Sequence, residues 1–113
     1  MFEIEVSDDD VVTVCRPAGE LDAMTVTEFR ERLVGLADRS HLVIDLCEVP
    51  FMDSTGLGAL IGGIRRIRDA GGDAAVACNR PAVLRLLHTT GFDRMVTVTD
   101  SVPEAISALT AET

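Results

Sequence analysis

The sequence predicts a single α/β domain over residues 1–113, with a mixed, mostly parallel β-sheet, an N-terminal hairpin and about four helices. Three observations predict this class. Short apolar runs of strand length alternate with longer segments in which apolar residues recur at helical spacing, which is typical of a parallel sheet with crossover helices. The first two runs are separated only by a polar turn, so they predict an antiparallel pair. A chain of 113 residues, 47% hydrophobic and 26% charged, can bury a core without a disulfide or a metal.

The N-terminal half is expected to hold two strands, a helix and a central strand. Residues 2–6 alternate apolar and acidic side chains, and residues 11–15 form a second apolar run after a polar turn. Thr25, followed three residues later by Glu28, predicts a capping box at the start of an amphipathic helix. The nearly continuous apolar run of residues 41–49 indicates a central strand that is covered on both faces.

The C-terminal half is expected to continue as helix, strand, helix, strand, helix. Gly71 and Gly72 predict the end of the first of these helices, and Gly91 the end of the second. Ser101 and Glu104 predict another capping box for the last helix. The five segments are residues 57–67, 74–78, 81–90, 95–98 and 101–109.

The charge of the chain excludes several classes of partner. Ten arginines and no lysine stand against 19 acidic residues, which gives a net charge of −9. Such a surface opposes direct binding of nucleic acid or of an anionic membrane. The longest nearly uncharged stretch, residues 54–64, is too short to cross a bilayer, and no secretory leader opens the chain, so we expect a cytoplasmic protein. Within this pattern, residues 8–10 predict a solvated acidic turn, and Arg65, Arg66 and Arg68 predict a solvated helix face that could meet an acidic patch.

The three cysteines, Cys15, Cys47 and Cys78, are far apart in the sequence and form no Cys-x-x-Cys pair. Each lies in an apolar run, so we expect three reduced and buried thiols, as in a cytosolic protein. A redox role for one of them stays open.

The segment 49–58, Val-Pro-Phe-Met-Asp-Ser-Thr-Gly-Leu-Gly, is the most informative part of the sequence. It joins a buried strand to a long helix, the place where functional groups gather in such sheets. Asp53 is the expected N-cap, and Ser54 and Thr55 then lie in the first helical turn with exposed hydroxyls. One interpretation is a plain capping turn. The other is a phosphate or phosphorylation site, because free amides and the helix dipole favour negative charge there.

Other functional patterns are weaker. Gly56, Gly58 and Gly62 resemble a dinucleotide fingerprint with one residue too many, and no acid ends the next strand to bind a ribose. The sequence has no Gly-x-Ser-x-Gly elbow, which argues against a hydrolase triad that uses His41 or His88. Both histidines are therefore interpreted as structural. No acids have metal-ligand spacing. We therefore expect no cofactor, no metal and no enzymatic activity.

Five segments together resemble one known family. They are Gly-Glu-Leu-Asp at residues 19–22, Leu-Val-Ile-Asp-Leu at 42–46, Phe-Met-Asp-Ser-Thr-Gly-Leu-Gly at 51–58, Arg-Leu-Leu at 85–87 and Thr-Gly-Phe at 90–92. In these residues the chain resembles the anti-sigma factor antagonists of bacteria, which are single STAS domains. The match spans nearly the whole chain, and its most specific part is the Asp-Ser-Thr-Gly stretch after an apolar strand.

The resemblance implies a mixed sheet with helices packed mainly on one side and a role in sigma factor regulation. Members bind an anti-sigma factor, often a serine kinase that uses ATP, and so release a sigma factor to activate transcription. Phosphorylation switches the antagonist off and a serine phosphatase restores it. Carried over, Ser54 is the acceptor, with Thr55 as the alternative; Asp22 is expected near Ser54 on the docking surface, and Asp53 and Gly56 position the acceptor turn. The chain is expected to be a monomer or a weak homodimer. The alternative is a non-switching STAS subunit of a larger assembly, such as a lipid-transport complex or a stress-signalling particle.

Overall fold

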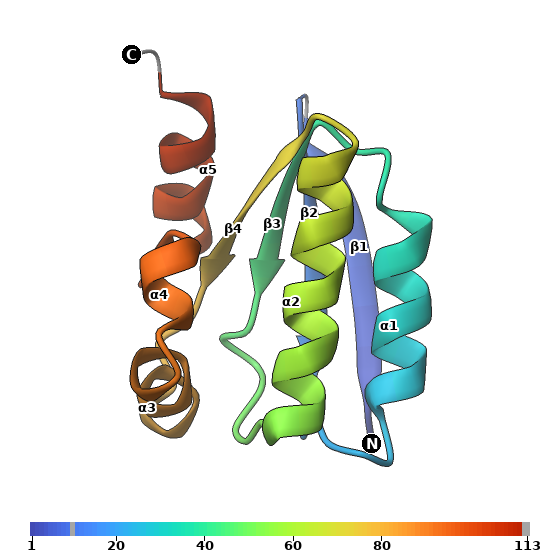
Figure 1. The fold of residues 1–113 in the computed structure, drawn as a ribbon, viewed down its shortest axis with the longest axis vertical. Coiled ribbons are helices and arrows are strands. Elements are labelled where there is room, and N and C mark those ends of the chain that lie inside the picture. Colours follow the sequence, from blue (N-terminus) through green and yellow to red (C-terminus); the bar gives the residue numbers. More distant parts are fainter. Residues whose placement is uncertain (10, 112–113) are drawn as a thin grey trace.

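The computed structural model describes residues 1–9 and 11–111 and contains a five-stranded sheet in the order β1-β2-β3-β4-β5 (Figure 1). β1 and β2 pair antiparallel, and each later pair is parallel, so the expected mixed sheet with an N-terminal hairpin is confirmed. The strands are β1 (Glu3–Asp9), β2 (Val12–Ala18), β3 (His41–Asp45), β4 (Asp73–Ala77) and β5 (Val98–Thr99).

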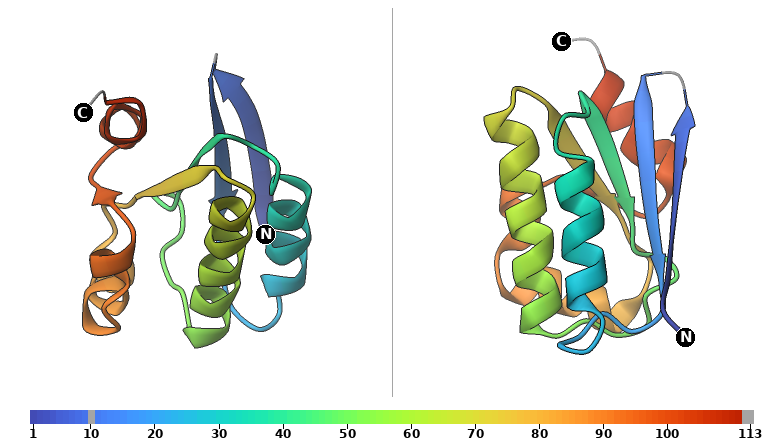
Figure 2. Two further views of the ribbon diagram at one scale, coloured as in Figure 1. Left: turned by 45° about the horizontal axis from the view of Figure 1, so that its top comes forward. Right: turned by 90° about the vertical axis from the view of Figure 1, so that its right-hand side faces the viewer.

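Helices cover both faces of this sheet unequally. One apolar core joins α1, α2, α3 and α4 to one face, while a smaller one lies under α5 on the other face (Figure 2). This confirms helices mainly on one side. The helices are α1 (Val26–Gly35), α2 (Ser54–Asp69), α3 (Pro81–Thr89), α4 (Phe92–Met95) and α5 (Val102–Thr110).

β3 shows why the central apolar run has no polar alternation. Leu42 and Ile44 belong to the core beneath α1 and α2, whereas Val43 belongs to the core beneath α5. All three side chains are fully buried. A strand that is covered on both faces has no solvated side on which polar residues are favoured.

The last strand was predicted in the wrong place, and the helix count was one too low. Residues 95–98 were expected as a strand, but Phe92–Met95 forms the single-turn helix α4 after Gly91, whose φ is +79°. The strand β5 begins only at Val98, where Cys78 N–H donates to the Thr99 carbonyl at 2.8 Å. Phe92 is almost completely buried, and the burial of this ring holds the helical turn against the core.

The two expected capping boxes have different outcomes. Ser101 caps α5 by accepting from Glu104 N–H at 3.4 Å, and its hydroxyl donates to the Glu104 carboxylate at 2.9 Å. Thr25 precedes α1 but makes no capping bond to it, so that prediction was wrong. Its hydroxyl donates to the Glu20 carbonyl at 2.8 Å instead, because the preceding loop folds back onto it.

Candidate functional site

The start of α2 is the centre of the candidate site. Asp53 caps this helix, since its carboxylate Oδ1 accepts from Gly56 N–H at 3.0 Å. Ser54 and Thr55 are both exposed in the first turn, as the sequence predicted. The first amides of an α-helix have no acceptor inside the helix, and the dipole adds a partial positive charge there. The Ser54 hydroxyl therefore lies in solvent at a helix end that tolerates an added anion.

The loop between β2 and α1 is bonded directly to this turn. Leu21 N–H donates to the Phe51 carbonyl at 3.0 Å, and Asp53 N–H donates to the Leu21 carbonyl at 3.2 Å. These two bonds place Asp22, the next residue, beside the start of α2. The structure thus brings together the two loops that carry the expected site residues.

Gly56 is what lets the two loops approach so closely. A Cβ at this position would lie 2.6 Å from the Leu21 carbonyl oxygen and 2.9 Å from the Leu21 Cγ. The Leu21 carbonyl could avoid this contact only if the whole loop shifted. Gly56 is one of the three glycines that resemble a dinucleotide fingerprint. Its presence is therefore explained by the packing of α2 against the loop that contains Asp22.

The Asp22 side chain is held by its own loop. Its carboxylate Oδ1 accepts from Met24 N–H at 2.9 Å, and Asp22 N–H donates to the Thr25 hydroxyl at 3.1 Å. The residue is half-buried, so one side of the carboxylate is fixed while solvent reaches the rest. This arrangement presents a negative charge in one orientation next to the Ser54 turn.

Apolar side chains border the same surface, and the sequence analysis missed them. Met24 is 90% exposed and Phe51 is 47% exposed. Beside them lies a shallow hollow of about 390 Å³ whose lining includes Phe2, Glu20 and Pro50 as well as Met24. The available indication was that Met24 and Phe51 lie in loop sequence, outside any strand or helix periodicity. Exposed apolar groups around polar anchors are typical of protein-binding surfaces.

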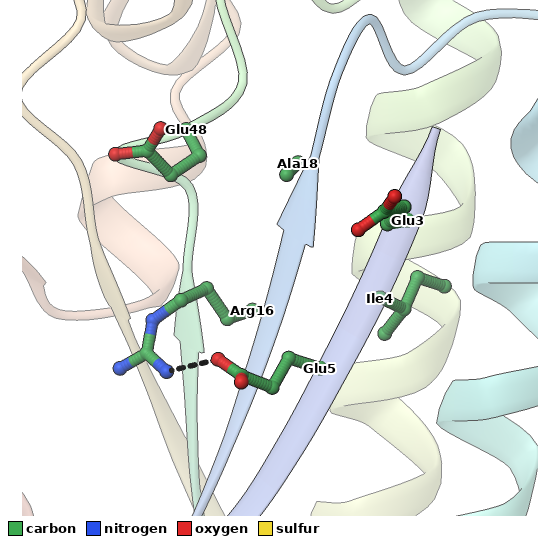
Figure 3. Close-up of a pocket in the computed structure, with 6 residues that line it drawn as sticks. All are labelled: Glu3, Ile4, Glu5, Arg16, Ala18 and Glu48. Carbon is green, nitrogen blue, oxygen red and sulfur yellow. Dashed lines mark hydrogen bonds and ion pairs between the residues drawn. The ribbon is translucent and has the colours of Figure 1, made fainter. Parts of the chain in front are cut away.

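A second hollow, of about 180 Å³, lies on the β1–β2 hairpin (Figure 3). Arg16 is its only cation among the lining residues, with Glu3, Glu5 and Glu48 around it. Arg16 donates to Glu5 at 3.1 Å and to the buried Asp45 at 2.8 Å, and these bonds raise the pKa of the guanidinium. Asp45 also accepts from Cys47 N–H at 2.9 Å. Arg16 thus connects β1, β2 and β3 through its ion pairs with Glu5 and Asp45, which indicates a structural role for this cluster.

The thiols are protonated groups rather than nucleophiles at neutral pH. Burial raises the pKa of Cys15 to about 11 and raises that of Cys78. Cys47 is half-exposed rather than buried as expected, because it lies at the margin of α5 beyond the end of β3. Partial burial and the neighbouring Asp45 carboxylate raise its pKa to about 12.

The described part of the chain contains neither a metal-binding cluster nor a membrane-spanning helix. Within residues 1–9 and 11–111, no group of three or more His, Cys, Asp or Glu side chains is arranged to hold a metal ion. Over the same residues, no helix is both long enough and apolar enough to span a membrane.

Comparison with known proteins gives a consistent result. The model of the family described as STAS domain matches residues 2–105. An anti-sigma F factor antagonist of Paenibacillus polymyxa is 33% identical over 111 residues, which covers 96% of this chain and 95% of the relative. An anti-sigma-B factor antagonist of Bacillus subtilis (strain 168) is 34% identical over 82 residues, or 72% of this chain and 75% of the relative. The crystal structure of an anti-sigma factor antagonist from Mycobacterium paratuberculosis superposes with a TM-score of 0.90 at 28% identity, covering 96% of this chain and 94% of that one.

Proposed function

The chain belongs to the STAS domain family, and we propose that it is an anti-sigma factor antagonist whose binding is switched by phosphorylation of Ser54. In the unphosphorylated state it binds an anti-sigma factor and thereby releases a sigma factor to activate transcription. Phosphorylated, it no longer binds. The protein acts in the cytoplasm as a binding partner and phosphoryl acceptor, not as an enzyme.

One observation supports this proposal above all. The exposed Ser54 hydroxyl lies at the start of α2, and backbone hydrogen bonds connect this turn to the loop that contains Asp22. Ser54 is accessible to a transferring enzyme, and the backbone bonds through Leu21 hold Asp22 beside it. A partner that covers this surface would contact both loops at once. The exposed Met24 and Phe51 would supply apolar contact area at the same place.

Transfer to Ser54 needs no catalytic group of this chain. The partner anti-sigma factor is a serine kinase that binds ATP and magnesium. Its base accepts the Ser54 proton, the hydroxyl oxygen forms a bond to the γ-phosphorus, and the bond to ADP breaks. A serine phosphatase later hydrolyses the ester and restores the hydroxyl. Thr55, one residue further on and also exposed, is the alternative acceptor.

A phosphoryl group on Ser54 is sufficient to end the complex. A hundredfold weaker affinity corresponds to only about 2.8 kcal/mol. The group adds about −1.5 to −2 charges at neutral pH, on the residue that follows Asp53 and next to the loop that contains Asp22. Burying this charge in an interface would cost solvation and add like-charge repulsion.

The test is incubation with the ATP-dependent anti-sigma kinases of the same genome, read by intact mass. We expect one phosphoryl group on the wild type and on Thr55→Ala, and none on Ser54→Ala. Ser54→Ala should keep binding the kinase, whereas Ser54→Asp should bind about a hundredfold more weakly. Full labelling of Ser54→Ala on another residue would overturn the site assignment. Absence of labelling by every kinase, together with stable co-purification in a larger complex, would instead support the non-switching STAS subunit.

A further inference from the structure

Residues of α2 and α4 line an apolar groove on the face of the sheet that carries four helices. Ile61, Phe92 and Met95 contribute apolar lining, and the hollow measures about 60 Å³. Met95 is 52% exposed, so the groove is open to solvent. Its size suits a single aliphatic side chain rather than a small molecule.

Arginines give this groove a charge opposite to that of the whole molecule. Arg65 and Arg68 belong to the lining and are both exposed. Arg68 is held by Asp73 at 3.1 Å and by the Met95 carbonyl at 3.0 Å. Arg65 has no ion pair within the described residues. On a chain with a net charge of −9, such a groove favours an occupant that combines an apolar side chain with carboxylates.

The tip of the β1–β2 hairpin has this combination. Val11 is 67% exposed and so offers an apolar side chain at the surface. Asp8 and Asp9 end β1 just before it, within the only run of three consecutive acids in the sequence. Asp8 is engaged by the Thr13 hydroxyl at 2.6 Å. Asp9 is exposed and forms no ion pair with another described residue.

We propose that the hairpin tip of one copy docks into the α2–α4 groove of a second copy, with Val11 in the groove and Asp9 against Arg65. The two surfaces are different parts of the chain, so the contact is head-to-tail. Contacts of this kind leave a free tip and a free groove at the ends and extend into longer chains.

This self-association leaves the proposed switch accessible. The hairpin tip lies near the amino end of β3, because Thr13 is paired with Leu42, whereas Ser54 follows the carboxyl end of β3. Figure 2 shows the carboxyl end of β1 and the start of α2 at opposite ends of the molecule. Assembly and binding of an anti-sigma factor are therefore independent properties, and failure of one does not imply failure of the other.

The test is sedimentation velocity of the full chain at low salt, up to about 1 mM protein, because a contact this small belongs to the weak class. We expect concentration-dependent growth beyond a dimer for the wild type, and at least tenfold weaker association for Asp9→Arg and for Arg65→Glu. The matched control is Arg30→Glu, which makes the same change in charge as Arg65→Glu at an exposed position of α1. This variant should associate like the wild type.

An equimolar mixture of Asp9→Arg and Arg65→Glu separates this arrangement from any other. The intact tip of the second variant can dock in the intact groove of the first, and the two substituted surfaces also carry opposite charges, so the mixture should associate more strongly than either variant alone. A wild type that stays monomeric throughout the range would overturn the proposal. So would association that neither substitution weakens, or single variants whose mixture does not restore association.

Discussion

At the scale of single residues, burial of thiols makes stability depend on alkaline pH. Cys15 is fully buried, and its pKa is about 11 against an ordinary value near 9.0. Burial is the main cause, with a small opposing effect of the Arg32 charge. The folded state therefore keeps the Cys15 proton after the unfolded state has lost it. This contribution to stability is complete below pH 9 and is lost as the pH rises towards about 11.

We expect the free energy of unfolding of the wild type to fall by about 2–3 kcal/mol more than that of Cys15→Ala between pH 9 and 11. Urea unfolding at several pH values measures the free energy of unfolding of the wild type and of Cys15→Ala. At neutral pH the variant should be less stable by about 1 kcal/mol, because it leaves a small cavity. Equal pH dependence of the two proteins would show that Cys15 does not titrate in this range.

Individual residues also show how far the site could be predicted from sequence. Asp53, Ser54 and Thr55 were placed correctly because a cap and a first turn depend on local sequence. The closeness of Asp22 depends on hydrogen bonds between residues about 30 positions apart, and only the family resemblance indicated it. The exposure of Met24 and Phe51 was not predicted, because apolar residues are usually assigned to the core, although both lie in loop sequence.

At the scale of elements, the start of α2 fits against the β2–α1 loop only because residue 56 is a glycine. A Cβ on Gly56 would overlap the Leu21 carbonyl, so Gly56→Ala must separate the helix from the loop. We expect a loss of about 1–3 kcal/mol of stability, which a urea titration measures. We also expect weaker binding of the anti-sigma factor, because Asp22 moves relative to Ser54.

Gly58 provides the matched control two residues along the same helix. It is exposed, and a Cβ there would meet no described atom within 4 Å. Gly58→Ala should therefore stabilise the protein by about 0.5–1 kcal/mol through helix propensity. If Gly56→Ala were as stable as Gly58→Ala, the close contact with Leu21 would not exist in solution.

The elements that sequence periodicity predicted well are those with long apolar patterns. The stripe of α2 and the double-sided burial of β3 were both read correctly from spacing. The region around α4 was not, because four residues are too short to show a period and both Phe92 and Val96 are buried, as strand residues would be. The prediction of a Thr25 cap was wrong for a different reason. The Thr25 hydroxyl donates to the Glu20 carbonyl, which lies outside the helix, and makes no bond to a helix amide.

At the scale of the whole molecule, the proposed switch changes a surface and leaves the fold unchanged. Ser54 is exposed, and the bond that caps α2 comes from Asp53. A negative charge on residue 54 gains about 0.3–1 kcal/mol from the helix dipole, and the charge of the adjacent Asp53 opposes this gain. Neither core of the molecule includes Ser54.

Ser54→Asp should therefore unfold at nearly the same temperature as the wild type, within about 4 °C, a shift that corresponds to less than about 1 kcal/mol. Backbone amide chemical shifts should change at residues 20–25 and 50–58, the two loops joined by the Leu21 bonds, and stay the same across β4, β5 and α5. Ser54→Ala measures what loss of the hydroxyl alone does. If Ser54→Asp instead melted well below Ser54→Ala, or shifted amides throughout the sheet, the modification would act by destabilising the fold. A weaker complex with the anti-sigma factor would then have a different cause from charge at the interface.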